Sequence, residues 1–100
     1  MPKPFYADYV NHILRFYFRW DNSKTFRNEV DEQNYKAADE IVRTLQTSER
    51  EILTTIYKSD SINVAENVVI ATSIHKRDVS EIWSLLSTIT SKIAKERRLI

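Results

Sequence analysis

The chain has 100 residues, of which 42% are hydrophobic and 11% aromatic, a composition that is typical of one folded domain and excludes a disordered chain. It has no cysteine, which excludes disulfides and thiolate chemistry, and no glycine, which argues against phosphate-binding loops and nucleotide sites. The net charge is +1, but residues 1–27 carry +3, residues 28–51 carry −4 and residues 75–100 carry +3, a layout that suits either a nucleic-acid binder or ordinary charge mixing on a surface.

The first two predicted helices are amphipathic. Over residues 5–20, with Pro4 in the first turn, apolar side chains recur every three or four positions: Tyr6, Tyr9, Val10, Ile13, Leu14 and Tyr17. The opposite, polar side would present Asp8, Asn11, His12, Arg15 and Arg19. A polar loop follows at residues 21–23. A second helix is expected over residues 31–45, with an inward side of Tyr35, Ala38, Ile41, Val42 and Leu45.

Three later helix starts are predicted from capping boxes, in which a side chain accepts from a free backbone N–H and a glutamate three residues later reaches back. The pairs are Ser48/Glu51, Asn63/Glu66 and Asp78/Glu81. They predict helices over residues 49–59, over 64–74 and from 79 into the nineties. The helix 64–74 is apolar almost all round, so we expect it to be central and buried. The last helix should face inward with Val79, Ile82, Trp83, Leu86, Ile89, Ile93 and Ala94. The fold class expected is therefore all-α with about five helices.

A helix-turn-helix is predicted for residues 64–95, because two helices are joined there by only a few residues. In that motif the second helix, here residues 79–95, lies in the major groove of DNA. We expect the DNA-facing residues to be Lys76, Arg77, Ser80, Glu81 and Ser84, and we expect Lys92 and Lys95 to contact phosphates. The alternative is a solvated serine-rich face with a basic last turn that complements the helix dipole.

The second half of the chain resembles region 4 of sigma-70-type factors. The segment Leu45–Leu53, followed by Tyr57, has the Ser/Thr cap, the Glu/Arg pairs and the Ile-Leu pair of the opening helix of that region. A helix that holds Ala71, a short turn and a long helix that leads into Lys92–Ile100 resemble the rest. The chain departs from region 4 in a longer connection from Tyr57 to Ala71, in the missing turn glycine, and in the lack of Arg and Lys at the centre of the last helix.

The whole chain is also similar to the short sigma-like regulators of phages and conjugative elements of low-GC Gram-positive bacteria. The resemblance implies a small DNA-binding transcription regulator, with double-stranded DNA as its partner and RNA polymerase as a further candidate partner. Residues 1–100 would form one domain, with a helical pair in residues 1–45 and the helix-turn-helix region in residues 46–100. A homodimer is a further option.

The first helix does not belong to that family pattern, because it carries a dense cluster of aromatic residues. One reading is that this cluster caps the core. The other is that it forms a contact surface for a protein, since aromatic residues are favoured at interface centres. The alternative function is therefore a helical protein-interaction module without DNA binding, whose interface residues would be Tyr6, Tyr9, Phe16 and Trp20.

Catalysis has little support in the sequence. His12 and His75 are the only histidines, and neither has a metal-type spacing with another ligand. The acidic residues fit surface ion pairs at i,i+4 spacing, as in Glu32/Lys36 and Asp39/Arg43. We expect no enzymatic activity, no metal, no cofactor and no small-molecule substrate.

The sequence also lacks membrane signals. Its apolar stretches are far shorter than the roughly 20 residues that cross a bilayer. The beginning, Met1-Pro2-Lys3-Pro4, does not have the apolar region of a signal peptide. We therefore expect no contact with membranes and a cytoplasmic location.

Overall fold

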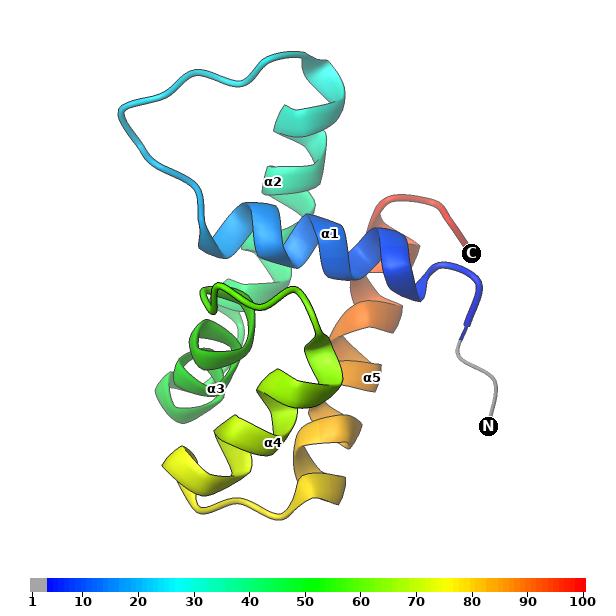
Figure 1. Cartoon of the computed structure of the whole chain (residues 1–100). Helices are drawn as coiled ribbons and strands as arrows, with labels where there is room; N and C mark the ends of the chain where they lie inside the picture. Colours follow the sequence, from blue (N-terminus) through cyan, green and yellow to red (C-terminus); the bar gives the residue numbers. More distant parts are fainter. Residues whose placement is uncertain (1–3) are drawn as a thin grey trace.

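The computed structural model describes residues 4–100, which form five α-helices (Figure 1). These are α1 (Ala7–Phe18), α2 (Glu29–Arg43), α3 (Thr47–Tyr57), α4 (Val64–His75) and α5 (Val79–Glu96). Because residues 4–100 contain no strand, the expected all-α fold of about five helices is confirmed. Residues 1–3, on which part of the expected N-terminal segment and of the domain 1–100 falls, lie outside the described residues.

One core joins all five helices. In Figure 1, α1 lies across the other helices, and it contacts α2, α3 and α5. α4 contacts α3 and α5, and α2 contacts α5. The fully buried side chains at the centre include Val10, Ile13 and Leu14 of α1, Leu53 and Ile56 of α3, and Ile82, Ile89 and Ile93 of α5. The buried residues of α3 are Ile52, Leu53, Ile56 and Tyr57.

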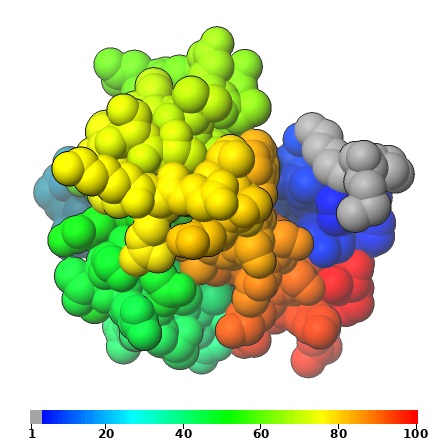
Figure 2. Space-filling view, turned by 90° about the horizontal axis from the view of Figure 1, so that it is seen from below, coloured from blue at the N-terminus to red at the C-terminus, as the bar shows by residue number. Residues whose placement is uncertain are grey.

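The expectation that α4 is buried all round is wrong. Its buried residues are Asn67, Val68 and Ala71, on the side that packs against α3 and α5. Its outer side is uncovered, and Figure 2 shows the end of α4 and the turn after it, in yellow, at the surface. Two residues of α5 that were expected to face inward, Val79 and Trp83, are also largely exposed. The exposed fractions are 63% for Val69, 49% for Ile70, 61% for Ile74, 45% for Val79 and 44% for Trp83. A helix that is apolar on every side is fully buried only if other helices pack against every side of it.

The N-cap half of two predicted capping boxes is confirmed. The reciprocal half of the Asn63/Glu66 box is wrong, because the Asn63 N–H donates to Ser61 Oγ at 3.1 Å and Glu66 accepts from that hydroxyl instead. The side chain of Asn63 accepts from the Glu66 N–H at 3.1 Å and begins α4. The side chain of Asp78 accepts from the Ser80 N–H at 3.3 Å and begins α5. These bonds satisfy backbone donors that have no partner inside the helix. The boundaries of both helices therefore lie where the spacing predicts them.

The predicted capping box Ser48/Glu51 is wrong. α3 begins two residues earlier, at Thr47, with Gln46 in the N-cap position. The carboxylate of Glu49 accepts from the Gln46 N–H at 3.0 Å, so the reciprocal half of a capping box is present in a different register. The box forms two residues earlier because Glu49 accepts from the Gln46 N–H, whereas Glu51 was expected to accept from the Ser48 N–H.

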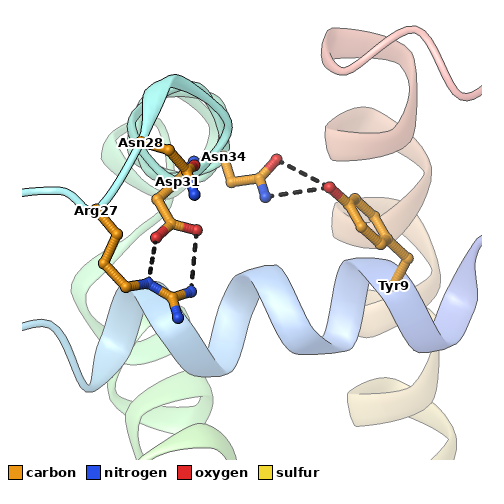
Figure 3. A network of polar contacts seen from close by, with 5 residues as sticks. All are labelled: Tyr9, Arg27, Asn28, Asp31 and Asn34. Carbon is orange, nitrogen blue, oxygen red and sulfur yellow. Dashed lines mark hydrogen bonds and ion pairs between the residues drawn. The ribbon is translucent and has the colours of Figure 1, made fainter.

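α2 also begins earlier than residue 31. The side chain of Asn28 accepts from the Asp31 N–H at 2.9 Å, and Asp31 forms an ion pair with Arg27 at 2.8 Å (Figure 3). Three residues further along α2, the amide of Asn34 donates to the Tyr9 hydroxyl of α1 at 3.2 Å (Figure 3). The first turn of α2 is therefore tied to the preceding loop, and its second turn is tied to α1.

The side of α1 that was expected to face solvent holds the connection between α3 and α4. Arg15 Nη1 donates to the carbonyl oxygens of Ser59 at 2.9 Å and Ser61 at 3.2 Å. Arg19 Nη1 donates to those of Lys58 at 3.0 Å and Ser59 at 3.1 Å. These carbonyls belong to the C-cap of α3 and to the connection after it, where no helix supplies a donor, and the two guanidinium groups supply one. The expectation of a solvated face is therefore wrong for Arg15, which is half-buried.

We expect Arg15→Ala to lower the free energy of unfolding by about 1–3 kcal/mol, because several carbonyl oxygens lose a charged donor. Urea denaturation followed by circular dichroism measures this change. The matched control is Arg50→Ala, an exposed arginine of α3 whose guanidinium contacts Thr47 of its own helix. We expect the control to stay within about 0.5 kcal/mol of the wild type. Equal losses in the two variants would contradict a special role for Arg15.

Candidate nucleic-acid interface

The turn between α4 and α5 depends on one residue in the left-handed conformation. Lys76 has φ 52° and ψ 45°, and its N–H bonds to the carbonyl of Thr72. The N–H of Arg77 reaches the same carbonyl at 3.3 Å. Helix ends of this kind usually place glycine at the left-handed position. Lys76 therefore occupies the position of the turn glycine that the sequence lacks, while His75 packs back on α3 with Nε2 2.7 Å from Thr55 Oγ1.

The predicted DNA-facing side chains lie mostly on one exposed side of α5. Its inward side consists of Ile82, Leu86, Ile89 and Ile93. The opposite side carries the exposed hydroxyl residues Ser80, Ser84, Ser87 and Thr88, with Ser91 half-buried. Lys92 and Lys95 are exposed and follow on the same side at helical spacing. We call this surface, from Ser80 to Lys95, the hydroxyl face.

The basic residues at the start of α5 are matched by acidic ones. Arg77 Nη1 lies 3.5 Å from Glu81 Oε2, an ion pair at i,i+4 spacing that sequence reasoning missed although the spacing shows it. Arg77 Nη2 also donates to Ser48 Oγ at 3.5 Å. Lys76 and Arg77 are thus balanced in formal charge by Asp78 and Glu81. The start of α5 is a mixed-charge surface rather than a purely positive one.

Some of the predicted residues border a shallow groove of about 660 Å³ between α5 and the α2–α3 connection. Ser80, Glu81, Ser84 and Lys92 line its α5 side, and its other wall is formed by Thr44, Leu45 and Glu49. Lys76, Arg77 and Lys95 are not among its lining residues. The structure therefore brings four of the seven predicted DNA-contacting residues into one groove and leaves the other three around it.

The four residues predicted as a protein interface lie on α1 or just outside its two ends, apart from this region. Tyr9 is 40% exposed, whereas Tyr6, Phe16 and Trp20 are half-buried. The ring of Trp20 stacks on Phe26 with centroids 4.6 Å apart, and Phe16 packs against Trp20 at 5.2 Å. These contacts hold the loop before α2 against the end of α1.

Over residues 4–100 no three His, Cys, Asp or Glu side chains gather in a way that could hold a metal ion. Within the same residues no helix is long and apolar enough to span a membrane.

Comparison with known proteins finds no match. This holds for protein-family models, for curated proteins and for solved structures.

We expect Lys76→Gly to raise the free energy of unfolding by about 0.5–1 kcal/mol, because a side chain with a Cβ is strained in the left-handed region and glycine is not. Thermal unfolding and urea denaturation measure the change. The matched control is Lys92→Gly, an exposed lysine within the regular part of α5. There we expect a loss of about 1 kcal/mol. If both glycines destabilised the protein, the interpretation of the turn would be wrong.

Proposed function

We propose that the chain binds double-stranded DNA through α5 and acts as a small transcription regulator of the helix-turn-helix type. The observation that carries the proposal is the tight α4–α5 turn, which leaves the hydroxyl face uncovered from Ser80 to Lys95. Short hydroxyl side chains allow a helix to approach base edges closely and to bond to bases or phosphates. A helix presented in this way fits the major groove.

The charges around the hydroxyl face suit contacts with the DNA backbone. Lys92 and Lys95 lie towards one end of the hydroxyl face, and Lys76 lies before the other end. Exposed lysines bind phosphates by releasing counterions, which makes such binding depend on salt. Arg77 would join them once a phosphate replaces Glu81 as its partner.

The resemblance to sigma region 4 supports the same role. In this proposal the protein is a sigma-like regulator of a mobile element, and RNA polymerase is its candidate protein partner. α1 and α2 lie outside the region of resemblance, so the DNA contact itself is assigned to α4, the turn and α5.

We expect Glu81→Gln to strengthen DNA binding about threefold to tenfold, because it frees Arg77 and removes a negative charge beside the groove. Fluorescence anisotropy of a labelled random duplex, titrated at several salt concentrations, measures the affinity. The matched control is Glu32→Gln, which changes the net charge equally but removes an acid of α2 that pairs with Lys36 at 2.9 Å.

A double variant tests whether the two lysines of α5 contact DNA phosphates. Lys92→Ala combined with Lys95→Ala should weaken binding and lower the slope of log K against log salt by about 2. Equal effects of Glu81→Gln and Glu32→Gln, or no binding by the wild type at low salt, would contradict the assignment of α5.

A specific observation favours a second candidate, a protein-interaction module that binds a second copy of the chain. Ile70 and Ile74 lie one turn apart on α4, Val79 and Trp83 lie one turn apart on α5, and all four are between 44% and 61% exposed. Exposed apolar patches of this kind mark protein contacts. The neighbouring residues 76, 77, 78 and 81 carry two positive and two negative charges, so opposite charges are available for pairing across a twofold axis.

For this candidate we expect the wild type to form dimers as its concentration rises. We expect Ile74→Asp to raise the dissociation constant of the dimer at least tenfold, which corresponds to a loss of about 1.4 kcal/mol or more of binding free energy. Sedimentation equilibrium measures both. Val30→Asp is the matched control, since Val30 is a 51% exposed valine on α2, outside the patch. A wild type that stays monomeric at every concentration would exclude the dimer.

A further inference from the structure

A small pocket of about 320 Å³ lies where the end of α1 meets α2 and α3. This volume is at the lower end of the range of pockets that hold small molecules. Among the described residues that line the pocket, three are cations, Arg43, Arg50 and Lys58, and none is acidic. The pocket therefore has a positive lining, in contrast to the mixed charges at the start of α5.

Two of these cations have no acidic partner. Arg50, Thr54 and Lys58 recur every four residues, so they follow one side of α3 over about 12 Å. Neither Arg50 nor Lys58 forms an ion pair within residues 4–100, and the guanidinium of Arg50 contacts only Thr47 Oγ1, at 3.5 Å. Arg19 adds a further cation beside this end of α3, because it donates to the Lys58 carbonyl at 3.0 Å. The donors of Arg50 and Lys58 are thus available to a bound anion.

The third cation, Arg43, is held in place from behind. Its Nε lies 2.8 Å from Asp39 Oδ2, and the Tyr17 hydroxyl donates to Asp39 Oδ1 at 2.7 Å. Burial and the hydrogen bond with Asp39 raise the pKa of Tyr17, so this hydroxyl stays protonated and keeps donating. The chain of contacts fixes the guanidinium through Nε and leaves its two Nη groups without a partner in the described part of the chain.

The charges of the pocket favour one class of anion. Three cations and one acidic partner, Asp39, leave two positive charges unmatched. A phosphate monoester carries close to two negative charges near neutral pH and has three oxygens that accept hydrogen bonds. A carboxylate or a phosphodiester of nucleic acid carries only one charge. Guanidinium groups bind phosphate with two parallel hydrogen bonds, so such a site needs side chains and no glycine-rich loop.

We propose that this pocket binds the dianionic phosphate group of a small molecule, held by Arg50, Lys58 and the Nη groups of Arg43. The lining also includes Trp20 and Tyr35, so the rest of the molecule would lie against aromatic side chains. The site goes beyond DNA binding, since none of the seven predicted DNA-contacting residues lines this pocket.

The test compares two probes of nearly equal shape, phenyl phosphate and phenyl sulfate, of which only the first becomes a dianion. Both are titrated at low salt and at about pH 7.5, above the second pKa of a phosphate ester at about 6. Amide shifts of ¹⁵N-labelled protein in NMR spectra measure binding. We expect phenyl phosphate to shift the amides of Arg50, Thr54 and Lys58, with a Kd of about 1 mM, as is typical of a ligand of this size. Phenyl sulfate should bind about fivefold more weakly, because it has one negative charge fewer.

Two arginine variants test the position of the site. Arg50 is exposed, so Arg50→Gln keeps the core intact, and we expect it to weaken phenyl phosphate binding about fivefold to tenfold. The matched control is Arg98→Gln, which removes the same charge from an exposed arginine after α5 that does not line the pocket. There we expect affinity within about twofold of the wild type.

Inorganic phosphate, as a third probe, distinguishes the sources of the group. Affinity equal to that of phenyl phosphate identifies free phosphate as the ligand, and weaker binding identifies an ester; both support the site. Three results would overturn the proposal: no shifts on α3 with phenyl phosphate, equal affinities for phenyl phosphate and phenyl sulfate, or equal losses in Arg50→Gln and Arg98→Gln.

The DNA titration is a separate readout with different residues, and Arg50→Gln should bind the labelled duplex as the wild type does. A duplex that shifts the α3 amides in place of phenyl phosphate would instead make this pocket a contact for the nucleic-acid backbone and overturn the proposal. A chain that binds DNA through α5 but does not bind phenyl phosphate removes this inference alone. A chain that binds phenyl phosphate but not DNA leaves it standing.

Discussion

Carbonyl oxygens at the end of α3 and just after it, including those of Ile56, Lys58, Ser59 and Ser61, are held from two sides, and the arrangement of the other helices depends on this. α1 contributes the guanidinium groups of Arg15 and Arg19, and α4 contributes the amide of Asn67. The end of α3 would otherwise leave these acceptors to water. The bonds fix the path from α3 into α4, and α4 in turn sets the position of the turn and of the hydroxyl face.

Much of the fold could be predicted because its signals are local. Asn63 and Asp78 are strong N-cap residues directly before apolar residues of helical period, and the structure begins α4 and α5 there. The start of α3 could not be read in the same way, since Ser48 is the better cap by residue type, yet Glu49 reaches back to Gln46. The exposure of α4 could not be predicted either, because its sequence does not tell how many helices pack around it.

The candidate site also has some features that can be predicted from the sequence and others that cannot. The hydroxyl face follows from the 3.6-residue period of α5, and the pairing of Arg77 with Glu81 lies within one turn, so both can be read from sequence. The orientation of the Asn67 side chain cannot be predicted from the sequence, because its amide donates to carbonyls six and eleven residues earlier in the chain. The Glu96 carboxyl of α5 also raises the pKa of Glu40 on α2, and the closeness of these two residues has no local signal in the sequence.

The long-range bonds of α1 also bear on how the chain folds. Arg15 bonds to residues 44 and 46 positions later, and Arg97 bonds to Asn34 across 63 positions. α3, α4 and α5 instead follow one another through short connections. Closing a long loop costs more chain entropy than closing a short one, and contacts between sequence neighbours form faster. Packing of α3, α4 and α5 is therefore kinetically favoured, and the slower step is the docking of α1 and of the end of α5 onto residues far away in the chain.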